Sequence, residues 1–324
     1  MTSNMNNSIP LRDRIDELIA FKQASGYSAA HLVKILGRFI RYAEEWEPGI
    51  VTVTKNVAEK WECMNPNETP ANQRSRKNAV QVLSKYFISK GIDSYLYPKC
   101  REIKSSFQPY IFSDRELADF FNACDNTKTP NLVRNDVVSL VFRMMYSCGL
   151  RASEVVNLTI RDVDLVQGTI SIKEAKFGKE RLLPVHDSLL KRMKIYHSKV
   201  LTGYGLDAPF FPNGRGGHYT TGGLYSIFRE RLFAAGISHG GKGHGPRVHD
   251  LRHTFAVHSL RKAVLNGEDI NSMLKYLSVY LGHSDVLSSE NYLRLTADVF
   301  PHIICCTEKY SNVIPEMEED NETY

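Results

Sequence analysis

Arg151 and Arg252 are the side chains best suited to chemistry on a phosphate. They stand in the segments Gly149-Leu-Arg-Ala-Ser-Glu154 and His249-Asp-Leu-Arg252. A guanidinium binds phosphate oxygens through two parallel hydrogen bonds and stays charged at physiological pH. Arg151 follows a glycine that predicts the end of a helix, and Glu154, one turn later, can orient its side chain. Taken alone, such an arginine–glutamate pair is more often structural than a phosphate clamp.

His249 precedes Arg252 by three residues and His253 follows it, so a helix would place all three on one face. The pattern His-x-x-Arg has little weight alone, because chance supplies about 0.7 copies in such a chain and His258-Ser-Leu-Arg261 is a second copy. His249 and His253 have the spacing of a zinc helix, but the glutamate of that motif is missing. We therefore expect no metal and no cofactor.

Two further segments carry a lysine hairpin and a tyrosine. Lys176 and Lys179 lie in Lys173-Glu-Ala-Lys-Phe-Gly-Lys-Glu-Arg181, where a lysine at a turn can swing into a neighbouring site or merely keep the turn soluble. His283 follows a glycine, and Tyr292 comes nine residues later. Most tyrosines in proteins have a buried ring and a hydrogen-bonded hydroxyl, so Tyr292 by itself does not indicate a function. Only the combination of these candidate residues favours one.

Read in chain order, these residues resemble the active site of the tyrosine recombinases, the lambda-integrase and Xer family. Four motifs occur in register over residues 149–295: Gly-Leu-Arg-x-Ser-Glu, Gly-Lys-Glu-Arg-Leu-x-Pro, His-x-Leu-Arg-His-Thr-Phe-Ala, and Leu-Gly-His with a tyrosine nine residues later. The resemblance implies strand cleavage and ligation, with a nucleophile that becomes joined to the 3′ side of the break. The catalytic set that it implies is Arg151, Lys176, His249, Arg252, His283 and Tyr292, supported by Glu154 and Lys179.

The residue types fit that reaction. Two arginines can stabilise the extra negative charge of the transition state, and cations around Tyr292 can draw off a phenolic proton whose reference pKa is about 10. The resemblance makes Lys176 the donor to the leaving hydroxyl, with Lys179 as local competitor; His249 would assist proton transfer or phosphate binding, and His283 would bond a phosphate oxygen. A phosphotyrosine link stores the cleaved bond without ATP. Clustered carboxylates are missing nearby, so a two-metal nuclease has no ligand set.

The segments Tyr276-Leu-Ser-Val-Tyr-Leu-Gly-His283 and Asn291-Tyr-Leu-Arg-Leu-Thr296 are more similar to transposon-encoded recombinases than to chromosome resolvases. We therefore expect a site-specific recombinase or integrase of a mobile element. It would act in DNA integration or transposition as a homotetramer on two DNA duplexes, each protomer clamping DNA between two basic domains, with sibling recombinases or accessory proteins as possible partners. An Xer-like resolvase, a type IB topoisomerase and a non-catalytic DNA-binding accessory protein remain open.

The surrounding pattern predicts a mainly α fold with a small antiparallel β-sheet. Residues 11–90 read as four helices, Ser113-Asp-Arg-Glu116 as a capping box, and residues 164–185 as hairpins. The expected parts are a helical core-binding (SAM-like) domain over 1–97, a basic linker over 98–112, a mixed α/β catalytic domain over 113–305 and an acidic tail over 306–324. Six cations are predicted to contact DNA: Arg74, Arg76, Lys77, Lys99, Arg101 and Lys104.

Charge and composition agree with a DNA partner. The 324 residues carry a formal charge of +5, but residues 306–324 hold one lysine against six acids, which leaves +10 on the rest. A basic body suits a polyanion, although a merely basic protein is equally compatible with this charge. The absence of long apolar runs, secretory signal and paired cysteines predicts a cytoplasmic, nucleoid-associated bacterial protein with reduced thiols. The tail is either disordered or docks on a neighbouring protomer.

Overall fold

The computed structural model describes residues 9–27, 29–63, 65–66, 68–98, 108–173, 180–241, 245–282, 292–293 and 295–296. These residues form two compact units, an N-terminal unit up to residue 98 and a C-terminal unit from residue 108. The predicted fold class, mainly helical with a small antiparallel sheet, is confirmed. The exact domain limits stay predictions. Among the described residues, no helix has the length and apolarity needed to span a membrane.

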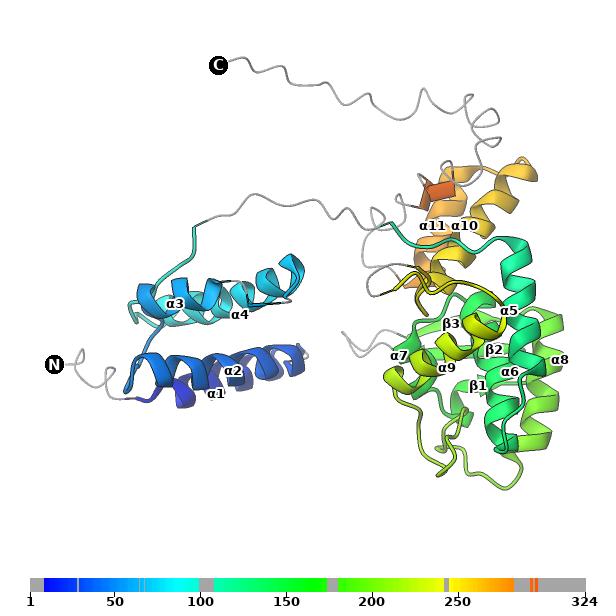
Figure 1. Ribbon diagram of the computed structural model, residues 1–324, viewed down its shortest axis with the longest axis horizontal. Helices are drawn as coiled ribbons and strands as arrows, with labels where there is room; N and C mark the ends of the chain where they lie inside the picture. Colours follow the sequence, from blue (N-terminus) through cyan, green and yellow to red (C-terminus); the bar gives the residue numbers. More distant parts are fainter. Residues whose placement is uncertain are drawn as a thin grey trace, which may run out of the picture. The chain divides into compact units, whose positions relative to one another are not determined.

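The N-terminal unit consists of packed helices, drawn in blue to cyan in Figure 1. Helix α2 lies against the other three, and its predicted apolar stripe is confirmed, since Ile35, Leu36, Phe39 and Ile40 are buried. The predicted N-cap Ser28 lies outside the described residues. The helices are α1 (Leu11–Ala24), α2 (Ala30–Trp46), α3 (Lys55–Glu62) and α4 (Pro70–Ser89).

The structure corrects the predicted DNA contact at Arg76. Arg76 is only 5% exposed, and its guanidinium donates two hydrogen bonds of 2.7 Å to the carboxylate of Glu68. It also donates to the main-chain carbonyls of Trp61 and Cys63. A buried charge must be paired and hydrogen-bonded, and Glu68 supplies the anion that the N-terminal end of α4 favours. Arg76 is therefore a structural residue of the unit.

We expect Arg76→Ala to destabilise the N-terminal unit by about 3 kcal/mol, because it leaves the buried carboxylate of Glu68 unpaired. Urea unfolding followed by tryptophan fluorescence measures this change in the full chain, since both tryptophans, Trp46 and Trp61, lie in this unit. Arg74→Ala is the matched control, because Arg74 is exposed on the same helix and should cost less than about 0.5 kcal/mol. Equal unfolding midpoints for the two variants would contradict the assignment.

The C-terminal unit is built around helix α6, which packs against α5, α7, α8 and α10. Helices α10 and α11 pack against each other and lie side by side in Figure 1. The elements are α5 (Asp114–Asn126), α6 (Leu132–Ser147), α7 (Ala152–Asn157), a 3₁₀ turn η2 (Ile160–Asp162), α8 (Asp187–Tyr196), a π turn η3 (His197–Leu201), α9 (Thr221–Ala234), α10 (Asp250–Leu265) and α11 (Ile270–Leu281).

A three-stranded antiparallel sheet completes the unit, in the order β1 (Val163–Asp164), β2 (Thr169–Lys173) and β3 (Glu180–Pro184). Lys173 pairs with Glu180, which brings the two sides of the lysine-bearing hairpin together at residues 173 and 180. The predicted capping box is confirmed: the Ser113 hydroxyl accepts from the Glu116 backbone, and the Glu116 carboxylate accepts from the Ser113 backbone. The sheet and α5 therefore follow from local sequence signals.

Candidate active site

The turn between α6 and α7 places the first arginine. Gly149 has φ +59°, and a Cβ there would lie 2.6 Å from Leu281 Cδ2 and 2.9 Å from Phe255 Cδ1. Only glycine therefore allows α10 and α11 to close on this turn. The predicted helix stop is confirmed, because α6 ends at Ser147 and Arg151 stands immediately before α7.

Arg151 is held from two sides. Its Nη1 donates to Glu154 Oε1 at 2.7 Å, and its Nη2 donates to the main-chain carbonyl of Gly282 at 3.0 Å. The other carboxylate oxygen of Glu154 accepts from the backbone N–H of Arg151 and from Nη2 of Arg181 on β3, both at 2.8 Å. Burial opposes ionisation of Glu154, but the hydrogen bonds from these arginines hold its pKa below the ordinary value. Glu154 thus orients Arg151, as its spacing suggested.

Arg252 lies deeper, at 1% exposure, in the second half of the first turn of α10. Its Nη1 donates to the Gly149 carbonyl at 2.7 Å and its Nη2 to the Leu281 carbonyl at 2.6 Å. Burial and the neighbouring charge of Arg151 lower the pKa of Arg252 to about 10, so it remains charged at pH 7. The C-terminal carbonyls of α11 carry partial negative charge. They bind both guanidiniums, with Arg252 at the Leu281 carbonyl and Arg151 at the Gly282 carbonyl.

The hydroxyl of Tyr292 reaches this cluster from the C-terminal part of the described chain. Its ring is 4% exposed and belongs to an apolar cluster with Val257 of α10 and Leu277 of α11. The hydroxyl oxygen, however, lies 3.1 Å from Nδ1 of His253. Burial raises the pKa of Tyr292, while the charge of Arg252 and a hydrogen bond from it act in the opposite direction. The ring is thus enclosed by apolar side chains, and its hydroxyl oxygen lies at the cluster of histidine and arginine side chains.

His249 stands at the N-cap position of α10, with its ring centroid 4.7 Å from that of His253 in an edge-to-face arrangement. Loss of surrounding water and the positive charges of Arg252 and Arg151 lower the pKa of His249. Part of the His249 side chain stays exposed to solvent. Lowering the pKa from 6.5 keeps the imidazole neutral at pH 7.

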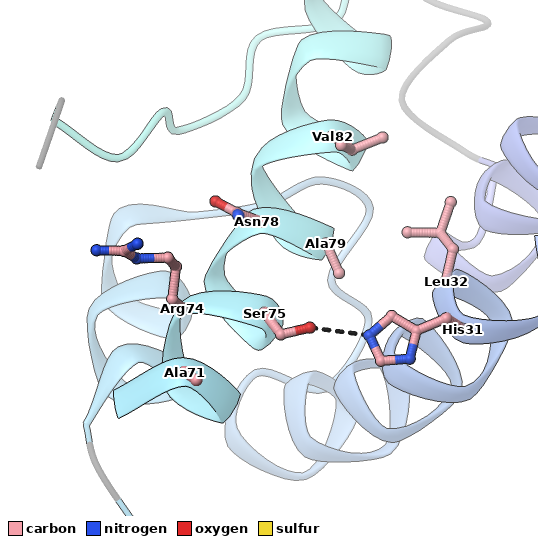
Figure 2. Close-up of a pocket in the computed structure, with 8 residues that line it drawn as sticks. All are labelled: His31, Leu32, Ala71, Arg74, Ser75, Asn78, Ala79 and Val82. Atoms are coloured by element: carbon pink, nitrogen blue, oxygen red, sulfur yellow. Dashed lines mark hydrogen bonds between the residues drawn. The ribbon is translucent and has the colours of Figure 1, made fainter. Parts of the chain in front are cut away.

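Several predicted residues fall outside the described residues: Lys176, Lys179, His283, Lys99, Arg101, Lys104 and the acidic tail. Of the remaining predicted DNA contacts, Lys77 is largely buried and pairs with Glu62. Arg74 is exposed at a groove of about 390 Å³ between α2 and α4, shown in Figure 2, where His31 Nε2 lies 2.8 Å from the Ser75 hydroxyl. Within the described ranges, no group of three or more His, Cys, Asp or Glu side chains is placed to hold a metal ion.

The structure adds two residues that sequence reasoning did not assign to the site, His253 and Arg181. Its spacing predicts that His253 shares a helical face with His249, and the structure shows that it contacts Tyr292, 39 residues away. Arg181 belongs to the hairpin motif, and its side chain, which is 10% exposed, forms an ion pair with Glu154. The sequence offered one indication for His253 and Arg181, which is that both lie within the motifs shared with the tyrosine recombinases. Their partners depend on how α10, β3 and the C-terminal residues pack.

The chain is similar in sequence to known integrases and recombinases. Residues 112–298 match the model of the phage integrase family. An integrase/recombinase of Sinorhizobium fredii is 27% identical over 300 residues, which cover 89% of this chain and 93% of that protein. The tyrosine recombinase XerC of Oceanobacillus iheyensis is 32% identical over 196 residues, covering 59% of this chain and 58% of XerC.

Two solved structures share the fold. The Tn1549 transposon integrase in complex with a circular intermediate DNA has a TM-score of 0.60 and 16% identity, covering 88% of this chain and 95% of that one. Lambda integrase bound to DNA has a TM-score of 0.57 and 16% identity, covering 85% and 92%. The family match spans more than half of the chain. This chain therefore belongs to the phage integrase family and is a tyrosine recombinase, an enzyme that cleaves and rejoins DNA strands.

Proposed function

We propose that this protein is a site-specific recombinase of a mobile element that exchanges DNA strands through a covalent phosphotyrosine intermediate. The observation that carries the proposal is the position of the Tyr292 hydroxyl, 3.1 Å from His253 and close enough to Arg252 for the charge of that arginine to oppose the rise in the pKa of the phenol. Arg151 is fixed beside Arg252 because both donate to adjacent carbonyls at the end of α11. A nucleophile next to two guanidiniums is the arrangement that attack on a phosphodiester needs.

In the proposed reaction, Tyr292 Oη bonds to phosphorus and the bond from phosphorus to the leaving sugar oxygen breaks. The phenolic proton passes from Oη to a neighbouring base, and Lys176 supplies a proton to the leaving oxygen, with Lys179 as its local competitor. Arg151 and Arg252 offset the charge that builds on the non-bridging oxygens, and His283 bonds one of those oxygens. His249, neutral at pH 7, binds the phosphate or assists proton transfer. Tyr292 becomes joined to the 3′ side of the break, and the reaction uses no metal ion.

The proposed partner is double-stranded DNA, bound by a homotetramer on two synapsed sites in the bacterial cytoplasm and nucleoid. The excess of basic residues outside the tail supports a polyanionic partner. In the N-terminal unit the exposed guanidinium of Arg74, beside the groove of Figure 2, is the described cation best placed for a phosphate. Lys99, Arg101 and Lys104 would add contacts from the segment between the two units. The acidic tail would either dock on a neighbouring protomer or remain disordered.

The proposed mobile-element role is supported by the relatives and by the sequence segments near Tyr292 that are similar to transposon-encoded recombinases. The integrase/recombinase of Sinorhizobium fredii aligns with most of this chain, and the Tn1549 transposon integrase shares its fold. The alignment with XerC covers little more than half of either chain, which gives the Xer-like resolvase less support. Inverted repeats flanking the gene would favour the mobile element.

The test is covalent trapping on a nicked suicide substrate cut from the DNA that flanks the gene. We expect the protein to form an adduct that survives denaturing electrophoresis and to recombine two plasmid-borne copies of the site. The control is a supercoiled plasmid without the site, which should stay supercoiled. Efficient relaxation of that plasmid would favour a type IB topoisomerase, and DNA binding with no adduct would favour the accessory protein.

A further inference from the structure

The buried hydroxyl of Tyr292 has two different hydrogen-bonding needs. Its oxygen can accept hydrogen bonds, and its proton must be given to an acceptor. Arg252 can serve only the oxygen, because a guanidinium carries N–H donors and no acceptor. At 4% exposure, a phenolic proton without an acceptor would be unfavourable, because a buried donor left unbonded has lost its hydrogen bonds to water without replacement. The contacts of Tyr292 must therefore include a group with a free electron pair.

His253 meets that need. Its Nδ1 lies 3.1 Å from the hydroxyl oxygen, and the two ring centroids are 5.6 Å apart. The side chain is half-buried on α10, directly after Arg252, so the helix that fixes the guanidinium also fixes the imidazole. A neutral imidazole with the proton on Nε2 presents a lone pair at Nδ1. In that form the phenolic proton points at His253 while Arg252 faces the oxygen.

We infer that His253 is the proton acceptor for the nucleophile Tyr292, a catalytic residue beyond the six that the family resemblance names. The inference rests on the proposed function. As Oη forms its bond to phosphorus, its proton moves to Nδ1 of His253, and the bond from phosphorus to the sugar oxygen breaks. The leaving oxygen takes its own proton from the separate donor, Lys176. Ligation runs the same transfers backward, and His253 returns the proton to Tyr292.

The neighbouring His249 is less well placed for this task. Its ring packs edge-to-face on His253, at 4.7 Å between centroids, whereas His253 itself contacts the hydroxyl of Tyr292. Loss of surrounding water, together with the charges of Arg252 and Arg151, also lowers the pKa of His249 and so weakens it as a base. An exposed position at the start of α10 suits His249 for contact with the phosphate instead.

The experiment compares wild type and His253→Asn on the nicked suicide substrate, with the rate of adduct formation measured at saturating protein. Asparagine can still hydrogen-bond the hydroxyl near the position of Nδ1 but cannot take its proton. We expect the adduct rate to fall by about 10²-fold or more, with DNA affinity and thermal midpoint close to wild type. His253→Gln is the second variant if the asparagine variant does not fold.

A second substrate separates the nucleophile from the leaving group. In this substrate sulfur replaces the leaving sugar oxygen. A thiolate can depart without being protonated, because the pKa of a thiol is far lower than that of an alcohol. We expect this substrate to leave His253→Asn slow while restoring the rate of Lys176→Ala, the matched control. The inference about His253 would be overturned if His253→Asn formed the adduct at the wild-type rate, or if the sulfur substrate restored its rate. Either result would leave the proposed function standing. A wild-type protein that forms no adduct would instead contradict the proposed function.

Discussion

Tyr292→Phe is expected to abolish the covalent adduct, lowering its rate of formation by roughly 10⁴-fold or more. The change removes a single oxygen atom, the proposed nucleophile, and leaves a ring that packs in the same apolar cluster. Affinity for the target duplex should stay within about twofold, because the ring is buried and the arginines are unchanged. The measurements are adduct formation on the suicide substrate and duplex binding by fluorescence anisotropy.

Tyr196→Phe is the matched control for that variant. Tyr196 is also 4% exposed in the C-terminal unit, and its hydroxyl donates to the Phe210 carbonyl at 2.8 Å. Losing that bond should cost about 1 kcal/mol of unfolding free energy and leave cleavage intact. An adduct that persists in Tyr292→Phe at the wild-type rate would remove Tyr292 from the nucleophile role.

Arg252→Lys is expected to lower the cleavage rate by about 10²- to 10³-fold, although the charge is retained. The guanidinium joins the Gly149 carbonyl to the Leu281 carbonyl through two separate nitrogens, and a single ammonium cannot reproduce that planar fork. The variant should therefore lose the alignment of charge beside Tyr292. It should also lose roughly 1–3 kcal/mol of stability from unsatisfied carbonyls. Single-turnover cleavage and urea unfolding measure the two effects separately.

Arg231→Lys controls for the burial of an arginine in the same unit. Arg231 lies on α9 and is 1% exposed, as is Arg252, but it belongs to a different helix from the cluster around Tyr292. We expect the folded Arg231→Lys protein to cleave at the wild-type rate. If Arg252→Lys also cleaved at that rate, the planar fork would not be needed for the reaction.

Local sequence patterns were sufficient for much of the fold. The capping box at Ser113, the helix stop at Gly149 and the hairpin strands each depend on residues close in the chain. The pairing of Arg151 with Glu154 was likewise predictable, because three residues along a helix bring side chains together. These features needed no knowledge of distant contacts.

Arg76 shows where a local interpretation failed. Its positive charge suggested a phosphate contact, but residues 76, 80, 83 and 87 form one apolar-facing stripe of α4. The phase of the helix placed Arg76 inside, and Glu68 compensates its charge. Helical periodicity was therefore the better guide than charge at this position. Charge alone cannot distinguish an exposed arginine from one neutralised by a neighbour.

The sequence by itself determined the family, the helical class and the set of reactive residue types, because these are recorded in motif spacing and periodicity. Only the tertiary structure decided that His253 contacts Tyr292 and that Arg181 shares Glu154 with Arg151. It also decided that the carbonyls ending α11 hold both arginines. The physical reason is that these contacts join residues 27 to 131 positions apart, and helix packing, which no local pattern encodes, sets their distances.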